Sequence, residues 1–413
     1  MIRRFEEDRD LEDVARIWRE IGWLAASESA TEAFETIVKV YDGWVAEVDG
    51  DSECYVGTTA GTMIHDQREL SSVLVGAVTT GRVARRRGLA TKLTARAMQE
   101  ALSGGAEVAM LGMFEQGFYD RLGFGTGSPL LVHRFTPTQL KVPRLQRPPR
   151  RLGQEDWSEV HTNRIQRRRR HGGVSWTKPE YTKAEMNFWP DSFGLGFEDG
   201  PDGGLSHHLW LTPMGGAVDG GPYQLMWMAF ETYEQLVELL SVLESLGDQV
   251  RQLIVPEPPG LRLQDFVKGP IHHQELTEGA KFELGIRASA QWQLRICNLK
   301  DCIEKTVVAG ADEVRFNLEL HDPVEAYCDP ENGWSGVGGT YVVSLGSSSS
   351  VRAGRDAELS TMRAGVGAFS RWWSGVAPAT TLAVSDRMKA PQWLLETLDR
   401  KISWSNPVPD WDL

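Results

Sequence analysis

The stretch VARRRGLATKL (Val83–Leu93) decides how this sequence is interpreted, because it joins a strand to a helix through arginines and small residues. Upstream, VLVGAVTT (73–80) has the apolar, β-branched composition of a strand. Downstream, LATKLTARAMQEAL (89–102) has helical apolar spacing and is followed by the helix-ending pair Gly104-Gly105. The next segment, AEVAMLGM (106–113), is apolar enough for a buried strand. The order strand, turn, helix, strand predicts a mixed α/β unit.

The turn itself has the chemistry of an anion site. Arg85, Arg86 and Arg87 run into Gly88, which fits the pattern R-x-x-G-x-A. Small residues let the backbone bend tightly and approach a ligand, and the first turn of a helix offers unpaired N–H groups. Those donors and the positive helix end suit a pyrophosphate, with arginines neutralising its charge. A basic turn on a solvated helix is the competing interpretation of the same spacing.

Composition narrows the class of partner. The chain has 413 residues and a net charge of −13, so it repels nucleic-acid phosphates and favours a cationic small molecule or basic peptide. The basic run RIQRRRRH (164–171) is interpreted as a solvated helix end. Carboxylates in MIRRFEEDRDLEDV exclude a signal peptide, and no run approaches the roughly 18 apolar residues of a membrane span. We therefore expect a cytoplasmic protein that binds neither membrane nor nucleic acid.

Metal and disulfide chemistry are not predicted. The four cysteines form no CxxC pair, and no histidine cluster has metal-ligand spacing, so free thiols and no metal site are expected. The His207-His208 and His272-His273 pairs are interpreted as loop residues. The cysteines are Cys54, Cys297, Cys302 and Cys328.

The rest of the chain divides into further blocks. IRRF (2–5) predicts a strand, and a helix follows over 10–24 with Asp10 as its N-cap. A Pro/Arg-rich linker, 141–152, precedes a second block whose order of elements echoes the first without its arginine-glycine turn. From about residue 290 the pattern becomes α+β, with a serine loop at 347–350. In this block Trp372-Trp373 either lines a cavity or packs in the core.

One strand after the arginine turn lies EQGFYDRLGF (115–124). The two segments together, in this order and separation, resemble the Gcn5-related N-acetyltransferase (GNAT) superfamily. In that superfamily the arginine turn holds the diphosphate of acetyl-CoA, and a splayed strand ahead of it, here 73–80, admits the pantetheine arm. The resemblance therefore favours the pyrophosphate interpretation over the solvated turn.

A more specific resemblance covers the whole chain. VTTGRVARRRGLAT (78–91), GFYDRLGFG (117–125), WQLRICNLKDCIE (292–304) and the end of the chain, LLETLDRKI and PVPDWDL, resemble the enhanced intracellular survival acetyltransferases. The resemblance implies an α/β and α+β protein, with tandem GNAT-like domains followed by a sterol-carrier-protein-like domain. The expected boundaries are 1–145 for the catalytic domain, 146–287 for a degenerate second domain and 288–413 for the third. A homohexamer is also implied.

The resemblance further implies a site and a reaction. An acetyl group passes from acetyl-CoA to a primary amine of a cationic acceptor, such as an aminoglycoside, a polyamine or a lysine. Tyr119 is the general acid and the α-carboxylate of Leu413 is the general base. N–H groups near Val78 to Thr80 stabilise the developing oxyanion. The residues expected at acetyl-CoA are Val78, Thr79, Thr80, Arg85, Arg86, Arg87, Gly88, Leu89, Ala90 and Thr91.

Alternatives stay open at both catalytic positions. Tyr119 also suits a core aromatic, and a chain end is usually disordered, although two prolines and Trp411 would stiffen this one. An α-carboxylate is ordinarily a poor base, so Asp410 or Asp412 is a candidate to assist or replace it. Other function classes are a ligand- or lipid-binding protein with relic acetyltransferase domains, and a transferase for a different acyl donor.

Three positions depart from the family pattern. Arg82 stands where proline is usual before the arginines, and the chain ends in Leu413 rather than phenylalanine. Phe114 replaces a small polar residue, which predicts a narrower, more apolar acceptor pocket. The first helix is followed by Trp23 and Leu24 where an acidic pocket residue is expected, with Glu28 beyond. Preference for an aminoglycoside is therefore in doubt.

Overall fold

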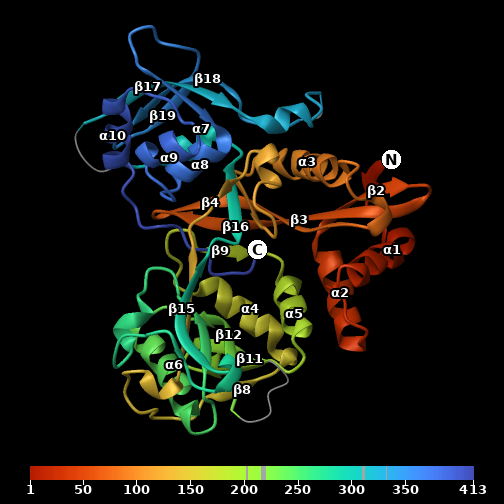
Figure 1. Ribbon diagram of the computed structural model, residues 1–413, viewed down its shortest axis with the longest axis vertical. Coiled ribbons are helices and arrows are strands. Elements are labelled where there is room, and N and C mark those ends of the chain that lie inside the picture. The colour runs from red at the N-terminus through yellow and green to blue at the C-terminus, as the bar shows by residue number, and fades with distance from the viewer. Residues whose placement is uncertain (201–202, 215–219, 309–311, 332) are drawn as a thin grey trace.

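The computed structural model describes residues 1–413 except 201–202, 215–219, 309–311 and 332. Figure 1 shows three units stacked along the long axis, with the N-terminal unit between the other two. Each unit is built on one sheet, and helices cover the sheets. The predicted α/β and α+β class is confirmed. Within the described ranges, every helix is too short or too polar to cross a bilayer.

The first sheet has a long twisted centre. Its order is β1-β2-β3-β4-β5-β16-β6, with β9 pairing with β3, and only β4 and β5 run parallel. The strands are β1 (Ile2–Arg4), β2 (Asp42–Val48), β3 (Asp51–His65), β4 (Arg68–Thr80), β5 (Val108–Gly112), β6 (Gly125–Thr126), β9 (Val174–Trp176) and β16 (Trp292–Ile296). Its helices are α1 (Glu7–Glu20), α2 (Glu28–Val40) and α3 (Leu89–Leu102).

The second sheet repeats the pattern of one parallel pair among antiparallel ones, here β12 with β13. Its order is β14-β15-β7-β13-β12-β11-β10-β8. The strands are β7 (Leu130–Phe135), β8 (Arg150–Leu152), β10 (Phe193–Phe197), β11 (His207–Pro213), β12 (Tyr223–Ala229), β13 (Leu253–Pro256), β14 (Gln274–Glu275) and β15 (Glu283–Ser289). The helices are α4 (Trp157–Gln166), α5 (Pro179–Phe188) and α6 (Tyr233–Ser245).

The third unit is smaller. Its sheet has the order β19-β18-β17-β20, with β17 and β20 parallel. The strands are β17 (Val314–His321), β18 (Gly339–Leu345), β19 (Ser350–Ala353) and β20 (Thr361–Gly365), and the helices are α7 (Leu299–Glu304), α8 (Val366–Trp373), α9 (Ala379–Ser385) and α10 (Gln392–Lys401). Trp372 and Trp373 are buried on α8, as core packing requires.

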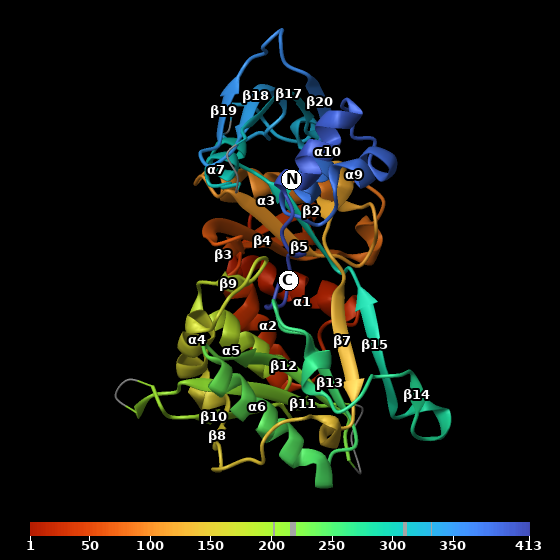
Figure 2. The ribbon, with the colours of Figure 1, turned by 90° about the vertical axis from the view of Figure 1, so that its left-hand side faces the viewer.

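Strands are exchanged between the units. β7 and β15, which lie side by side in Figure 2, both belong to the second sheet, although β7 precedes the predicted boundary at 145. β16, beyond the predicted boundary at 287, lies between β5 and β6 of the first sheet. Strand pairing thus crosses the limits of the expected domains 1–145, 146–287 and 288–413. This division of the chain into domains stays a prediction.

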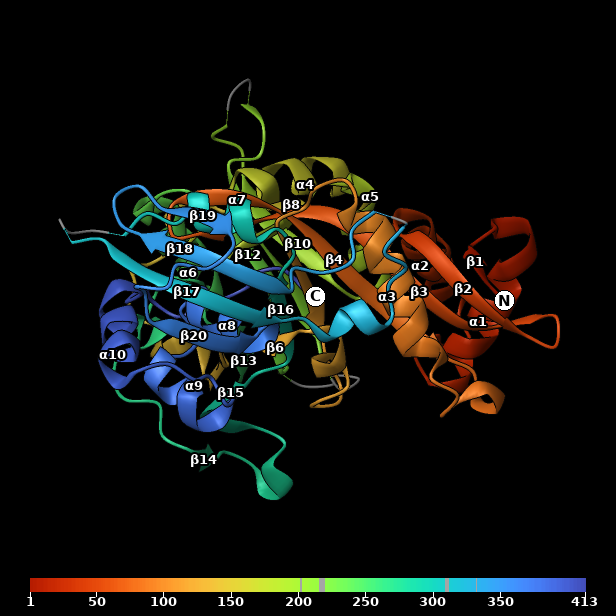
Figure 3. The same ribbon diagram turned by 90° about the horizontal axis from the view of Figure 1, so that it is seen from above.

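The exchange of β16 gives the first and third units a shared core. One hydrophobic cluster runs from Trp18 on α1 through Trp292 on β16 to Phe369 on α8. Because buried apolar area is the main source of stability, this continuous core holds the two units together. The last residues of the chain join the same cluster through Trp411. The C-terminus accordingly lies at the centre of the molecule in Figures 1 and 3.

Two local predictions were wrong. Helix α1 begins at Glu7, and Asp10 is buried within its first turn, where its carboxylate accepts two hydrogen bonds of 2.6 Å from the Arg3 guanidinium. Asp10 is therefore not the N-cap residue, which is Glu6; it fastens β1 to α1 and also accepts from the Glu6 N–H at 2.8 Å. His207 and His208 are buried in β11 and hydrogen-bonded, not loop residues; His272 and His273 do lie outside regular structure.

A buried ion pair fixes β16 to the third unit. The Arg295 guanidinium on β16 bonds the Asp322 carboxylate at 2.5 Å and also donates to the carbonyl of Leu122, and neither charged side chain is exposed. Asp322 in turn accepts from the N–H of Val337 at 2.9 Å. Removing one partner of such a pair leaves an uncompensated buried charge.

We predict that Arg295→Met lowers the free energy of unfolding by about 3–5 kcal/mol, because the Asp322 carboxylate stays buried without its cation. Urea unfolding followed by tryptophan fluorescence measures the change. Arg363→Met, which removes an exposed arginine paired with Glu319, is the matched control and should leave the unfolding midpoint unchanged. Equal effects of the two substitutions would contradict this account.

Candidate functional site

The two parallel strands of the first sheet separate partway along their length. β4 pairs with β5 from Ser72 to Leu74 and no further, although β4 runs on to Thr80 and β5 to Gly112. A bulge in the pairing with β3 lies in this second half of β4, where Ala77 has a positive φ of 54°. Bulges bend and twist a strand, which turns the end of β4 away from β5. The result is an open wedge in the sheet.

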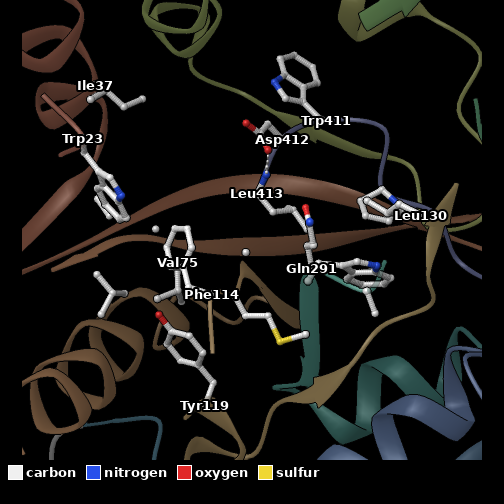
Figure 4. A pocket seen from close by; sticks show the side chains of 18 of the residues that line it. Trp23, Ile37, Val75, Phe114, Tyr119, Leu130, Gln291, Trp411, Asp412 and Leu413 are labelled. Atoms are coloured by element: carbon white, nitrogen blue, oxygen red, sulfur yellow. Dashed lines mark hydrogen bonds between the residues drawn. The ribbon is translucent and has the colours of Figure 1, made fainter. Parts of the chain in front are cut away.

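The wedge leads into a cavity of about 770 Å³. Its walls come mainly from the first unit, with Leu130 of the second unit, the segment leading into β16, and the chain end, as Figure 4 shows. The lining residues are Trp18, Trp23, Ile37, Tyr41, Val75, Gly76, Ala77, Val78, Gly112, Met113, Phe114, Gln116, Tyr119, Leu130, Ala290, Gln291, Trp292, Pro409, Trp411, Asp412 and Leu413. The structure therefore brings Val78, Tyr119 and Leu413, three of the residues expected at the site, to one cavity.

Tyr119 begins a short 3₁₀ turn, Tyr119–Leu122, and is 7% exposed. Its ring packs edge-on against Phe118 and Phe124, while Figure 4 shows its hydroxyl directed into the cavity. Burial, and to a smaller extent the nearby Cys54 thiol, raises the pKa of Tyr119 above its usual value of 10. The hydroxyl is thus a protonated donor at neutral pH. The side chain therefore fits both interpretations, a core aromatic and a site residue: its ring packs in the hydrophobic core and its hydroxyl faces the cavity.

The chain end is an ordered wall of the cavity. The Asp410 carboxylate accepts from Arg167 at 2.7 and 2.9 Å and from the N–H of Val174 at 3.1 Å. Two residues further along both segments, the indole N–H of Trp176 donates to the backbone carbonyl of Asp412 at 3.0 Å. The tail therefore runs beside β9 of the first sheet and is held both by β9 and by Arg167, which follows α4 of the second unit. We refer to residues 407–413 as the tail.

Trp411 is the apolar anchor of the tail. The Arg164 guanidinium lies 3.7 Å from its ring centroid, and its indole N–H donates to the Glu185 carboxylate at 3.0 Å. Arg164 and Glu185 pair with each other at 2.5 Å. A cation on an aromatic face, desolvated and ion-paired, is a favourable contact. Trp411 is 4% exposed, so this end of the chain is packed like core.

These contacts overturn the prediction for the basic run 164–171. Helix α4 ends at Gln166, so most of the run lies beyond it, and Arg164, Arg167 and His171 are buried. Two of the arginines hold the tail instead of facing solvent. The physical reason lies far away in the sequence, because their partners Asp410 and Trp411 are more than 240 positions downstream.

The carboxyl group of Leu413 lies against the end of β5. A side chain at position 112 would collide with a terminal carboxylate oxygen of Leu413, so glycine at Gly112 permits this close approach. Beside it, the Asp412 carboxylate accepts from the Leu413 N–H at 3.2 Å. Asp412 is exposed by its accessible surface and lines the cavity, and desolvation by the surrounding protein atoms raises the pKa of its carboxyl group. Two carboxylates therefore lie together on this wall.

The predicted acetyl-CoA residues beyond Val78 lie away from the cavity lining. Thr79 and Thr80 stay paired with β3, and Arg85 to Thr91 form the turn and first helical residues leading into α3. Arg86 has a φ of 61° and Gly88 a φ of 74°, so the backbone turns sharply here. Arg85, Arg86 and Arg87 are exposed, and among the described residues none of the three makes an ion pair.

The start of α3 fits a pyrophosphate. No side chain caps the helix N-terminus, and a β-carbon at Gly88 would meet no atom within 4 Å, so the backbone donors face open space. Free N–H groups at a helix start, with three unpaired guanidinium groups beside them, are complementary to a diphosphate. On β4, Val78 of the cavity lining lies two residues before the end of the strand at Thr80, and the turn follows from Arg85.

Several cavity residues were not predicted. Gln291 and Trp292 enter with β16, where the Met113 N–H donates to the Gln291 carbonyl at 2.8 Å, and Tyr41 lies on the flat floor left by Gly57 and Gly76. A glycine in each neighbouring strand is a weak sequence signal for such a close approach.

Glu28, the acid nearest the expected acceptor wall, does not line the cavity. Arg82 instead donates to the end of α1 at Glu20.

Comparison with known proteins agrees with this geometry. Residues 2–127 match the family described as acetyltransferase (GNAT) domain. Over the whole chain, the fold is similar to a probable N-acyltransferase from Enterococcus faecalis (14% identity, TM-score 0.78, 100% and 99% of the two chains covered). It is also similar to Eis1 from Mycobacterium abscessus (16%, 0.75, 100% of both chains) and to a GCN5-related N-acetyltransferase from Kribbella flavida (16%, 0.74, 100% and 98%). No significant match is found among curated protein sequences.

These similarities and the wedge define the class of protein. The N-terminal unit contains a GNAT acetyltransferase domain, and the protein is an acyltransferase. Acetyl-CoA is the cosubstrate that such domains use. Its overall fold is similar to that of Eis1, in agreement with the resemblance drawn from the sequence.

We predict that Arg167→Ala frees the tail, because Asp410 loses both guanidinium bonds. Carboxypeptidase should then release Leu413 rapidly, and kcat for acetyl transfer should fall about a hundredfold, within the range expected for losing a positioned base. Arg168→Ala, which removes the exposed arginine next in sequence, is the matched control and should change neither value. Unchanged protease resistance and activity in Arg167→Ala would refute the role given to this ion pair.

Proposed function

We propose that the protein transfers the acetyl group of acetyl-CoA to a primary amine of a cationic acceptor, an aminoglycoside, a polyamine or a lysine side chain. Tyr119 is the general acid and the α-carboxylate of Leu413 the general base. One observation carries the proposal: the Tyr119 hydroxyl and the chain's C-terminus line the same cavity, at the wedge between β4 and β5. The chain resembles enhanced intracellular survival acetyltransferases, and on that basis we extend the proposal to a homohexamer.

In the proposed complex the turn before α3 holds the donor. Arg85, Arg86 and Arg87 neutralise the diphosphate while N–H groups of Leu89, Ala90 and Thr91 donate to it. The backbone from Val78 to Thr80 lies along the acyl arm, and its N–H groups stabilise negative charge on the thioester oxygen. Acetyl-CoA supplies a thioester whose carbonyl carbon the amine attacks. The protein binds and orients both partners and moves the protons.

The proton steps balance. An alkyl ammonium has a pKa near 10, so it must lose a proton before it can attack, and the Leu413 carboxylate accepts that proton. Tyr119, kept protonated by its raised pKa, donates to the departing sulfur. That first proton passes from the carboxylic acid to solvent, so the carboxylate can accept the second proton, which the nitrogen loses once it is bonded to the carbonyl carbon. The second proton then passes to the phenolate, which leaves an amide, a thiol, the starting enzyme and one proton released to solvent. The Asp412 carboxylate lies beside this base and accepts from the Leu413 N–H at 3.2 Å.

Two other functions are distinguishable. A ligand- or lipid-binding protein with relic domains would bind no acetyl-CoA, and the sterol-carrier-like third unit would hold its ligand. The open, uncapped start of α3 favours retained donor binding. A transferase for another acyl donor would bind coenzyme A and prefer propionyl- or longer-chain thioesters to acetyl-CoA.

The test of the proposal is coenzyme A thiol release from acetyl-CoA with polyamines, aminoglycosides and lysine peptides. The protein carries no C-terminal tag, because an extension displaces the proposed base. Release that depends on one class of amine supports the transferase. Coenzyme A binding without release from any thioester or amine overturns the proposed reaction, and absence of binding favours the ligand carrier.

We predict that Tyr119→Phe lowers kcat about a hundredfold or more while leaving acetyl-CoA affinity unchanged, because only the acidic hydroxyl is lost. Burial disfavours the phenolate and so raises the pKa of Tyr119. The acid form therefore persists throughout neutral and mildly alkaline pH, and wild-type kcat/KM should rise with pH without a falling limb below about pH 10. A falling limb near neutrality would contradict this assignment, as would full activity of Tyr119→Phe.

We predict that one glycine added after Leu413 lowers kcat about a hundredfold, because it moves the carboxylate by roughly 3.5 Å, one residue of extended chain. Leu413→Phe is the matched control, since it changes the side chain and keeps the carboxylate in place; its kcat should stay within about threefold. Steady-state thiol release measures both variants. If the extended chain were as active as Leu413→Phe, the terminal carboxylate would not be the base.

A further inference from the structure

We propose that the acceptor carries a single ammonium group on an apolar, aromatic-sized body, and that Trp23 and Phe114 select it. The inference rests on the proposed acetyl transfer and narrows its substrate class from cationic amines in general. Polycationic acceptors are disfavoured, because the cavity offers only one position at which an ammonium group meets negative charge.

The charge of the cavity supports one ammonium. Among the described residues that line it, the only ionisable acids besides phenols are the Asp412 side chain and the terminal carboxylate of Leu413, and these adjoin each other. An ammonium taken out of water requires an opposite charge or several hydrogen bonds. The two carboxylates supply that partner at one wall. Further ammonium groups of a polycation would face apolar walls instead.

Those walls are aromatic. Trp23 and Phe114 have ring centroids 5.4 Å apart at 44°, and Trp23 is supported from behind by the buried Trp18, also at 5.4 Å. Trp18 in turn packs on Phe34 at 4.9 Å. The pair is therefore backed by α1 and α2 rather than carried on a free loop. In Figure 4 Trp23 and Phe114 lie on the opposite side of the cavity from Leu130.

Phe114 is 83% exposed, although it is a large apolar side chain at a cavity rim. Its packing contributes little to the free protein, but an apolar ligand body placed against it would remove that surface from water. Polar recognition in the acceptor region comes from Gln116 and Gln291, which are neutral. A flat apolar body seated on Trp23 and Phe114, with its ammonium directed to Asp412 and Leu413, satisfies both the charge and the apolar walls.

The test compares kcat/KM for 2-phenylethylamine and tryptamine with kcat/KM for spermidine and kanamycin. We expect the aromatic amines to exceed the polycations by about tenfold or more, and Phe114→Ala to lower kcat/KM for the aromatic amines about tenfold, mainly through KM, with little change for spermidine. Phe114→Leu should retain most of the preference. Val384→Ala, which truncates a residue 88% exposed on α9, is the matched control.

A preference for spermidine or kanamycin, or a selectivity ratio that Phe114→Ala leaves unchanged, would overturn the inference. Calorimetric binding of 2-phenylethylamine in the presence of coenzyme A separates this result from failure of the proposed reaction. Binding that Phe114→Ala weakens, without turnover of any amine, refutes acetyl transfer and supports the aromatic site. Absence of binding refutes the aromatic site even where other amines are acetylated.

Discussion

The rest of the site depends on the seating of the tail. Residues 407–413 leave the third unit, are gripped by the second and end in a cavity of the first. The grip combines an ion pair, Arg167 with Asp410, and an aromatic anchor, Trp411 between Arg164 and Glu185. Because fixing a chain end costs conformational entropy, several contacts of this kind are needed to hold it. The terminal carboxylate is therefore a product of the assembled fold and exists at the cavity only when all three units are in place.

The same dependence explains the strand exchange. β16 places Gln291 and Trp292 in the cavity and ties the third unit to the first through Arg295 and Asp322. The third unit is thereby fixed where its chain end can reach β5. Glycine at Gly112 then leaves room for the carboxyl group. The first unit supplies the wedge and the tail supplies the opposite side, so the site as a whole is not formed by a single unit.

Local features of this architecture follow from the sequence and distant ones do not. The arginine turn, α3 and the segment with Tyr119 are encoded in adjacent residues, so spacing and turn chemistry predict them, and the resemblance correctly pointed to a GNAT fold. The burial of Arg164 and Arg167 is set by Asp410 and Trp411, which no local pattern connects with them. Asp10 likewise resembles an N-cap in the sequence, but the nearby strand residue Arg3 draws it into the first turn. The pairing of β16 with β5 joins segments far apart in the sequence, so the composition of either segment does not predict it.

The central claim is that Leu413 delivers its carboxylate to the reacting end of acetyl-CoA. The most direct measurement is a crystal structure of the untagged protein with coenzyme A bound. The account predicts that the thiol lies in the wedge between β4 and β5, with the Tyr119 hydroxyl and the Leu413 carboxylate both lining the cavity around it. A tail seated elsewhere, or a coenzyme bound away from the turn at Gly88, would contradict it.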